Sequence, residues 1–404
     1  MQLPVYLDYA ATTPVDTRVA EAMGRCLTAE GIFANPASRS HVYGWQAEEQ
    51  VELARRNVAD LLGCDPREII WTSGATESNN LALKGIFERL DCKGDRGNRG
   101  QNEGCKGHLI TSVIEHKAVI DPAKWLESNG VEVSWLEPDS DGSISVEQVQ
   151  RALREDTCMV SIMQVNNETG VVNPIAEIGQ LCREHNLCRE NKVLLHVDAA
   201  QAAGKLDIKV DVLQADLLSV SAHKFYGPKG VGALYVRRSV QNQLSPLLHG
   251  GGHERGMRSG TLPTHQLVGM GEAACLAAAL RESEMVEISQ LRDRLWQGIA
   301  DLPGMKRNGS ASRVSPGHLN VCFSGVDGET LLLSLRELAV STGSACTSAS
   351  MEPSYVLKAM GVSDVDALSS IRFSLGRFTS ETDVEKAIAH IRTIYTQLQQ
   401  VQVV

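Results

Sequence analysis

Two short segments place chemically capable side chains directly after runs of apolar, partly β-branched residues. The segment SVSAHKFYGPKG (219–230) brings Lys224 to the end of one such run, and LLHVDAAQAAGK (194–205) brings Asp198 to the end of another. Taken singly, a lysine here is most often a surface residue, and an aspartate at a strand end is often a helix N-cap. Together, an amine that can form a Schiff base and a carboxylate that can pair with a ring nitrogen suggest cofactor chemistry.

A third segment supplies the kind of turn that binds phosphate. TSGATES (72–78) places Gly74, Ala75 and Thr76 where an apolar run is expected to pass into a helix. Backbone N–H groups at a helix start favour phosphate, and the carboxyl ends of parallel strands meet at one edge of a sheet. A phosphate-binding turn, an aspartate and a lysine at one edge predict a site for pyridoxal 5′-phosphate (PLP).

The segment STGSACTSAS (341–350) surrounds Cys346 with small residues only. Cysteine is usually a buried residue, so this setting is unusual. On local grounds the simplest interpretation is a cysteine in a flexible loop that does nothing. A thin, mobile loop would also suit a sulfur that must reach a buried substrate and then an acceptor. We expect this loop to be mobile.

The elements that must position these residues alternate along the first two thirds of the chain. Buried strands are expected within 68–73, 108–113, 158–165, 193–198, 216–222 and 231–236, and helices within 45–63 and 175–185. This alternation predicts a mainly parallel α/β sheet. The segment 91–107 is rich in glycine, asparagine and charge and is expected to be a loop.

A change of character near residue 265 predicts a second, smaller α+β domain. Two long helices are expected at 265–282 and 283–302, and an amphipathic helix at 382–400 closes the chain. We predict a large α/β domain over 15–262 and a small α+β domain made of 1–14 and 263–404.

Composition excludes several classes of protein. The chain has 39 Lys and Arg against 49 Asp and Glu, a formal net charge of -10, so direct nucleic-acid binding is not expected. No apolar run approaches the ~20 residues that a membrane span needs, and the N-terminus lacks the features of a signal peptide. We therefore expect a cytoplasmic protein.

The ten cysteines are scattered and do not form a disulfide framework. Two groups suggest metal ligands at first sight, but their spacing matches no zinc pattern, so no metal is expected. These groups are Cys182 with His185 and Cys188, and Cys105 with His108.

Over nine tenths of its length, from YLDYAATTPVD to SSIRFSLGRFT, the chain resembles the cysteine desulfurases of the IscS/NifS type, in the class-V aminotransferase family. The matching stretches are NPASRSH, TSGATESNN, EHKAV, VNNETG, HVDAAQAAGK, SAHKFYGPKG, HGGGHERGMRSGTLP, GSACTSAS and SSIRFSLGR. The resemblance implies the PLP-dependent transferase fold of type I. In that fold, a mainly parallel seven-stranded sheet flanked by helices is joined to a smaller α+β domain.

The resemblance also implies a role for each matching position on the cofactor ring. Lys224 would hold PLP as a Schiff base, Asp198 would pair with the pyridine nitrogen, and Gln201 would bond the phenolic oxygen. His116 would stack on the ring and relay protons, where a capping or surface histidine is the plain alternative. Asn167 would contact the cofactor or the substrate carboxylate.

Around the phosphate, the resemblance assigns contacts to Ala75, Thr76, Ser221 and His223. Thr261 would reach the phosphate across a dimer interface. The expected assembly is therefore a homodimer with shared sites.

The implied reaction takes sulfur from L-cysteine and leaves L-alanine. Arg372 would bind the substrate carboxylate, although a surface or ion-paired arginine is the plain alternative. Lys224 would remove the Cα proton, and Cys346 would attack the substrate sulfur as a thiolate and become a persulfide. Acceptor proteins would then take the sulfur for iron–sulfur cluster assembly, for tRNA or cofactor thiolation, or for DNA phosphorothioate modification.

Some alternatives stay open at the level of sequence. The chain could be a selenocysteine lyase, another PLP lyase or aminotransferase of fold type I, or a sulfur-relay scaffold without activity. The combination of Lys224, Asp198, His116 and Cys346 favours the desulfurase. The sequence ends in QLQQVQVV (397–404), whereas housekeeping relatives carry a longer tail that docks the cluster scaffold, so the destination of the sulfur is left open.

Overall fold

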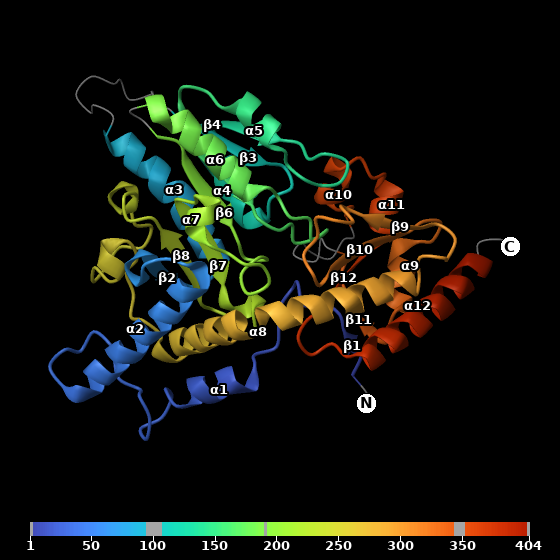
Figure 1. Cartoon of the computed structure of the whole chain (residues 1–404), viewed down its shortest axis with the longest axis horizontal. Helices are drawn as coiled ribbons and strands as arrows, with labels where there is room; N and C mark the ends of the chain where they lie inside the picture. Colours follow the sequence, from blue (N-terminus) through green and yellow to red (C-terminus); the bar gives the residue numbers. More distant parts are fainter. Residues whose placement is uncertain (1–2, 94–106, 190–191, 343–351, 402–404) are drawn as a thin grey trace.

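The structure is a computed structural model of the chain, and it describes residues 3–93, 107–189, 192–342 and 352–401 (Figure 1). Cys346 lies outside the described residues, as does most of the expected 91–107 loop. The expected mobility of the Cys346 loop therefore stays a prediction.

The large sheet has seven strands in the order β2-β8-β7-β6-β5-β3-β4. Every neighbouring pair is parallel except the two pairs that involve β8, which runs against both β7 and β2. The mainly parallel seven-stranded sheet is thus confirmed. The strands are β2 (Ile69–Thr72), β3 (His108–Ser112), β4 (Glu132–Leu136), β5 (Thr157–Met163), β6 (Leu194–Asp198), β7 (Leu217–Ser221) and β8 (Gly232–Val236).

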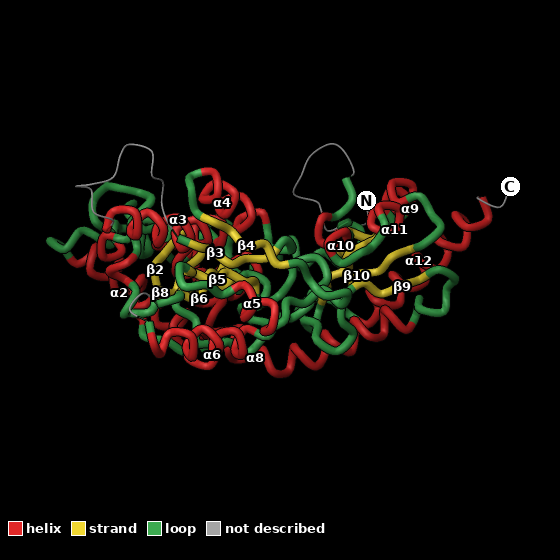
Figure 2. Tube along the Cα trace, turned by 90° about the horizontal axis from the view of Figure 1, so that it is seen from above, coloured by secondary structure: helices red, strands yellow, loops and turns green. Residues whose placement is uncertain are grey.

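Helices cover both faces of this sheet, with α3 and α4 on one side and α6 and α8 on the other (Figure 2). A separate apolar cluster fills the space beneath each layer, which explains why most of the strands are buried on both faces. The helices of this part are α1 (Thr17–Gly24), α2 (Val42–Leu62), α3 (Ala75–Lys93), α4 (Lys117–Ser128), α5 (Val146–Ala152), α6 (Ile175–His185) and α7 (Val210–Leu213). Short 3₁₀ turns lie at Pro66–Glu68, Asn186–Cys188, Ala222–Lys224, Gln241–Gln243 and Glu254–Gly256.

The smaller part is built on an antiparallel sheet in the order β12-β10-β9. Beside it, β1 pairs with β11 in parallel, so the N-terminal segment packs with the C-terminal one, and Leu7 belongs to their common core. The division into domains at 14/15 and 262/263 stays a prediction. The elements are β1 (Val5–Tyr6), β9 (Met305–Asn308), β10 (His318–Phe323), α9 (Gly328–Ser334), β11 (Leu338–Ala339), α10 (Tyr355–Ala359), α11 (Asp364–Leu368), β12 (Ser370–Ser374) and α12 (Glu381–Val401).

One expectation about the helices is wrong. The two helices expected at 265–282 and 283–302 are a single helix, α8 (Thr264–Gln297), which runs between the two parts of the molecule (Figure 1). No glycine or proline interrupts the sequence between the two expected helices, and its charged residues are good helix formers. The helix packs on α1 and α2 and also on β10 and α12.

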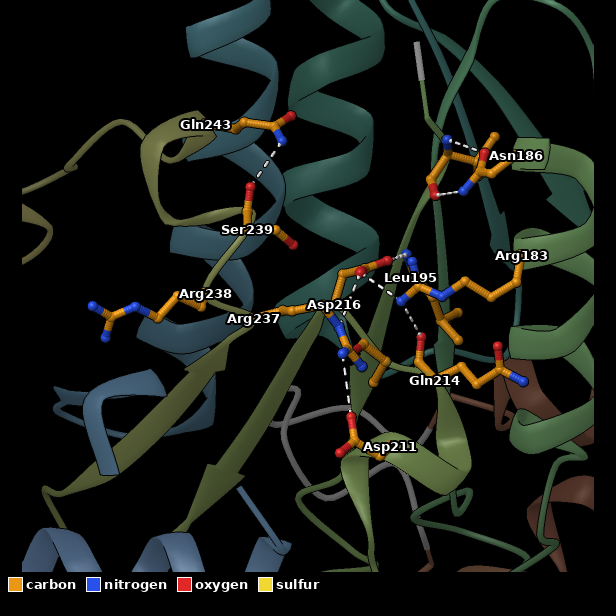
Figure 3. A network of polar contacts seen from close by, with 12 residues as sticks. Arg183, Asn186, Leu195, Asp211, Gln214, Asp216, Arg237, Arg238, Ser239 and Gln243 are labelled. Carbon is orange, nitrogen blue, oxygen red and sulfur yellow. Dashed lines mark hydrogen bonds and ion pairs between the residues drawn. The ribbon is translucent and has the colours of Figure 1, made fainter. Parts of the chain in front are cut away.

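At the amino ends of β6 and β7, a buried carboxylate organises a polar network (Figure 3). Asp216, with a side chain 2% exposed, accepts hydrogen bonds from Leu195 N at 2.9 Å and from Arg183 Nη2 at 2.7 Å. Arg237 also contacts Asp216 and reaches the exposed Asp211. The network joins α6, β6, β7 and β8 at the amino ends of β6 and β7, away from Asp198 and Lys224.

Among the described residues, no helix combines the length and apolar character required to cross a lipid bilayer.

Candidate active site

A cavity of about 630 Å³ opens at the carboxyl ends of β5, β6 and β7. The structure brings most of the sequence-predicted site residues together in its wall, from segments far apart in the chain. Those residues are Ala75, Thr76, His116, Asn167, Asp198, Gln201, Ser221, His223, Lys224 and Arg372.

Two predicted residues are not placed there. Thr261 is exposed and is not part of the cavity wall. Cys346 lies outside the described residues, but the chain on either side of it is held close to the cavity. Ser341 pairs with the backbone of Arg372, and Tyr355 donates its hydroxyl to the carbonyl of Glu115 at 2.7 Å, next to His116.

The end of β7 positions the lysine. Strand β7 stops at Ser221 and the chain turns through a 3₁₀ turn that carries Lys224. Lys224 Nζ donates hydrogen bonds to the carbonyls of Ala10 and Ala11 at 2.7 and 2.9 Å. The N-terminal segment therefore forms one wall of the cavity.

The histidine next to this lysine is held neutral. His223 Nδ1 lies 3.1 Å from Thr12 Oγ1. Burial, reinforced by the positive charge of Lys224, lowers the pKa of His223 to about 4. At neutral pH this ring is an uncharged hydrogen-bonding group of the cavity wall.

The end of β6 positions the aspartate. Asp198 accepts hydrogen bonds from Asn79 Nδ2 at 2.7 Å and from the backbone N–H of Ala200 at 2.9 Å. The bond to Ala200 is the local turn expected of a strand-terminal aspartate, whereas the bond to Asn79 comes from α3. Sequence reasoning missed Asn79, although it lies one helical turn after Ala75 on the helix that starts at the cavity.

The start of α3 directs backbone donors into the cavity. Gly74 has a φ of 150°, a conformation that other residues rarely adopt, and α3 begins at the next residue. The first N–H groups of a helix have no partner within the helix, which makes this end suitable for phosphate. The carboxylate of Glu77 in the same turn is engaged by Ser73 N at 2.7 Å and Arg258 Nε at 2.8 Å.

The start of α4 positions His116, which caps the helix by accepting a hydrogen bond from Ala118 N at 3.1 Å. His116 is therefore a helix cap, as in the alternative interpretation of this residue, and it also lines the cavity. Burial lowers the pKa of His116, so its ring is neutral at pH 7. The preceding Glu115 is fully buried, and burial raises its pKa to about 8.

The arginine on β12 faces the cavity across the N-terminal segment. Arg372 pairs with Asp8 at 2.7 Å through Nη2 and donates to the carbonyl of Asn167 at 2.9 Å through Nη1. The remaining Nε of Arg372 and the Oδ1 of Asn167 are buried and have no hydrogen-bond partner among the described residues. Asp8 was missed because its segment suggested no chemistry.

These features fit PLP. The cavity offers helix N–H groups for a phosphate, a lysine amine and a hydrogen-bonded aspartate. The buried donor on Arg372 and the buried acceptor on Asn167 lack partners in the described structure, and buried polar groups are normally paired. A polar ligand in this cavity would supply partners for both.

The fold and the site together define a class of protein. The family described as aminotransferase class-V matches residues 5–387, and the chain belongs to it. It is a PLP-dependent enzyme of fold type I.

Closer comparisons define the kind of enzyme within this family. The chain is 58% identical to the cysteine desulfurase IscS of Aeromonas salmonicida over 97% of its own length and 93% of that protein. A solved NifS-like protein superposes with a TM-score of 0.87 at 36% identity, covering 98% of this chain and 100% of the other. A structure described as SspA in complex with cysteine gives 0.78 at 41% identity, covering 93% and 99%. The chain is a cysteine desulfurase.

Proposed function

We propose that this enzyme takes sulfur from L-cysteine in the 630 Å³ cavity, releases L-alanine and carries the sulfur as a persulfide on Cys346. The observation that carries the proposal is the convergence of Lys224, Asp198 and His116 on one cavity that also receives the start of α3. When bound there, PLP supplies a carbonyl carbon that condenses with amines and a ring that withdraws electrons from Cα.

The cavity residues would hold the cofactor. Lys224 would make the covalent bond, and the Asp198 carboxylate, fixed by Asn79, would keep a proton on the ring nitrogen. Gln201 would donate to the phenolic oxygen, and His116 would contact the ring. Ala75, Thr76, Ser221 and His223 would hold the phosphate.

Four side chains act on the substrate. The Lys224 amine takes the Cα proton, and Arg372 with Asn167 holds the substrate carboxylate. The thiolate of Cys346 attacks the substrate sulfur, forming an S–S bond as the C–S bond breaks. Cβ then takes a proton and Cα regains the proton held by Lys224, which gives alanine. The electron pair of the broken C–S bond stays on the substrate carbon, so no external oxidant is needed.

Proton exchange during the reaction falls to His116, because its ring is neutral at pH 7 and can accept a proton. The placement of Ser341 and Tyr355 beside the cavity supports delivery of Cys346 to the substrate.

The test measures alanine and persulfide formation from L-cysteine by the PLP-loaded enzyme. Lys224→Ala should abolish alanine formation and covalent cofactor attachment. Cys346→Ser should abolish persulfide formation, whereas Cys275→Ser, at an exposed free cysteine, should match the wild type. Sulfide release by Cys346→Ser at the wild-type rate would overturn the assignment of the nucleophile.

The same assay separates the alternatives. Turnover of selenocysteine without turnover of L-cysteine would identify a selenocysteine lyase. Cofactor binding with no turnover of either amino acid would favour the sulfur-relay scaffold.

The sulfur is proposed to pass to acceptor proteins. High identity to IscS favours iron–sulfur cluster assembly, and tRNA or cofactor thiolation and DNA phosphorothioate modification are the competing destinations. With a net charge of -10, we expect contact with acceptor proteins and not with nucleic acid directly. The buried free thiols of Cys26, Cys182 and Cys322 support a reducing, cytoplasmic location.

The working unit is proposed to be a homodimer in which Thr261 reaches the phosphate of the partner's site. In this chain Thr261 is exposed and stands apart from the cavity wall. Large aromatic side chains are also exposed near the start of α2, with Phe33 at 54% and Tyr43 and Trp45 each at 56%. Such a group of aromatic residues is typical of protein–protein interfaces.

A further inference from the structure

A second lysine lies directly behind the cavity. Lys205 Nζ donates to Gln201 Oε1 at 2.9 Å, and Gln201 Nε2 in turn donates to the carbonyl of Ala10 at 2.8 Å. The same carbonyl accepts the hydrogen bond from Lys224 Nζ at 2.7 Å. Lys205, Gln201, Ala10 and Lys224 thus form one connected set of contacts.

This arrangement determines which way the Gln201 amide faces. In its charged form Lys205 can only donate hydrogen bonds, so the atom of Gln201 that faces this ammonium group must be the oxygen. The NH₂ group is then directed to the opposite side, toward Ala10 and the cavity. The carbonyl of Ala10, which can only accept, favours the same orientation, and without Lys205 this orientation would rest on that bond alone.

The position of Lys205 is set by a close backbone contact. Gly204 has a φ of 73°, and a Cβ at this position would lie 2.6 Å from the Cβ of Phe225, the residue after Lys224. The turn that carries Lys205 is therefore pressed against the turn that carries Lys224, and only glycine allows this approach.

The surroundings of Lys205 are cationic and poorly hydrated. Burial, together with the charges of Lys224 and Arg372, lowers the pKa of Lys205 to about 7. The titratable and charged groups around it come from several elements. They are Lys224 and His223 after β7, Arg372 on β12, His318 on β10, Glu284 on α8, and Tyr9 and Tyr226.

A small cavity of about 20 Å³ lies on the other side of Ala10, lined by Lys205 and His318. Both ring nitrogens of His318 are buried without a hydrogen-bond partner among the described residues. A space of this size holds one water, which could accept from Lys205 and bond His318. The ammonium group thus has room for a second partner besides Gln201.

We propose that Lys205 is a positioning residue of the active site, which orients the Gln201 amide as a donor to the cofactor and adds a positive charge behind it. The inference rests on the proposed role of Gln201 toward PLP. The plain alternative is that Lys205 only ties one turn of the fold together.

The test compares PLP-loaded variants by the pH titration of the visible absorption of the bound cofactor and by the PLP dissociation constant. Lys205→Met keeps the length of the side chain and removes the charge and the donor. Because a neighbouring cation disfavours further positive charge, the midpoint should move upward by about one pH unit. PLP binding should weaken about tenfold.

Two controls accompany this variant. Lys205→Arg retains the charge and the donors and should restore a midpoint close to that of the wild type. Lys209→Met removes an exposed lysine four residues away and should change neither quantity.

In a Gln201→Leu background, Lys205→Met should weaken PLP binding much less than tenfold, since the two residues act together.

An unchanged midpoint and PLP affinity in folded Lys205→Met would overturn the proposal. If this variant does not fold, Lys205→Gln gives the same comparison, and failure of both to fold would assign Lys205 to the fold alone. Both measurements require bound PLP but no turnover. Their results therefore do not depend on the outcome of the desulfurase assay.

Discussion

Among individual residues, Asn79 is expected to affect cofactor binding through Asp198, because it is buried and bonded to Asp198 at 2.7 Å. Asn79→Ala should weaken PLP binding by roughly 10- to 100-fold, the loss expected for a hydrogen bond to a charged group. Titration of the apoenzyme with PLP measures this change. Asn80→Ala is the matched control, since the Asn80 amide donates to the carbonyl of Thr76 in its own helix; an equal loss there would exclude a specific role for Asn79.

Glu115 makes a separate prediction about pH. Its pKa in the folded protein is raised to about 8 by burial, above the value of about 4.3 expected in the unfolded chain. Its contribution to stability is therefore greatest below pH ~4.3 and is lost as the pH rises toward 8. Glu115→Gln, which stays neutral, should be more stable than the wild type at pH 8 by up to about 4 kcal/mol.

Chemical denaturation at pH 5 and pH 8 measures this difference, which should shrink strongly at pH 5. Glu287→Gln replaces an exposed carboxylate and should show no comparable pH dependence. A Glu115→Gln variant less stable than the wild type at pH 8 would contradict the raised pKa of Glu115.

At the residue scale, part of the active site could be predicted from the sequence. Asp198 and Lys224 follow apolar runs, and the shared edge of a parallel sheet was enough to predict their meeting. Asn79 and Asp8 could not be found in this way. Each acts through a contact with a distant segment, and the partner of Asp8 is Arg372, at the other end of the chain.

At the scale of elements, the Asp216 network joins helix α6 to strands β6, β7 and β8 at the amino ends of β6 and β7, away from the active site (Figure 3). Asp216→Asn should lower the free energy of unfolding by about 3 kcal/mol, because two arginines lose a buried carboxylate partner. The folded variant should keep the wild-type PLP affinity. Asp211→Asn removes only the exposed partner of Arg237 and should cost much less; equal losses would contradict the central role of Asp216.

Six of the seven strands of the large sheet were predicted because each is a short apolar run. Strand β4, whose residues are exposed or only partly buried, was missed, and the order of the strands was not predictable. The reversal of β8 depends on long-range pairing that no local pattern encodes. For α8, sequence gave the correct helical periodicity and the wrong number of helices. Whether a helix continues depends on what it packs against at each end, and α8 has partners in both parts of the molecule.

At the scale of the whole molecule, shared sites in a homodimer can be tested by mixing two inactive variants. Lys224→Ala lacks the reactive amine, and Thr261→Asp should repel the phosphate of the partner's site. If Thr261 acts across the interface, subunit exchange between them forms hybrid dimers with one intact site, and desulfurase activity should return. No recovery, in mixtures shown by mass spectrometry to contain hybrids, would place Thr261 outside the partner's site.

The antiparallel orientation of β8 also has a consequence for folding during synthesis. Strand β2, which leads into the turn at Gly74, is the first strand of the large sheet to leave the ribosome, and its one strand neighbour in the described sheet is β8, the last. The nascent chain must therefore wait for nearly the whole sheet before β2 is paired, and until then β2 exposes unpaired edges to chaperones and to aggregation.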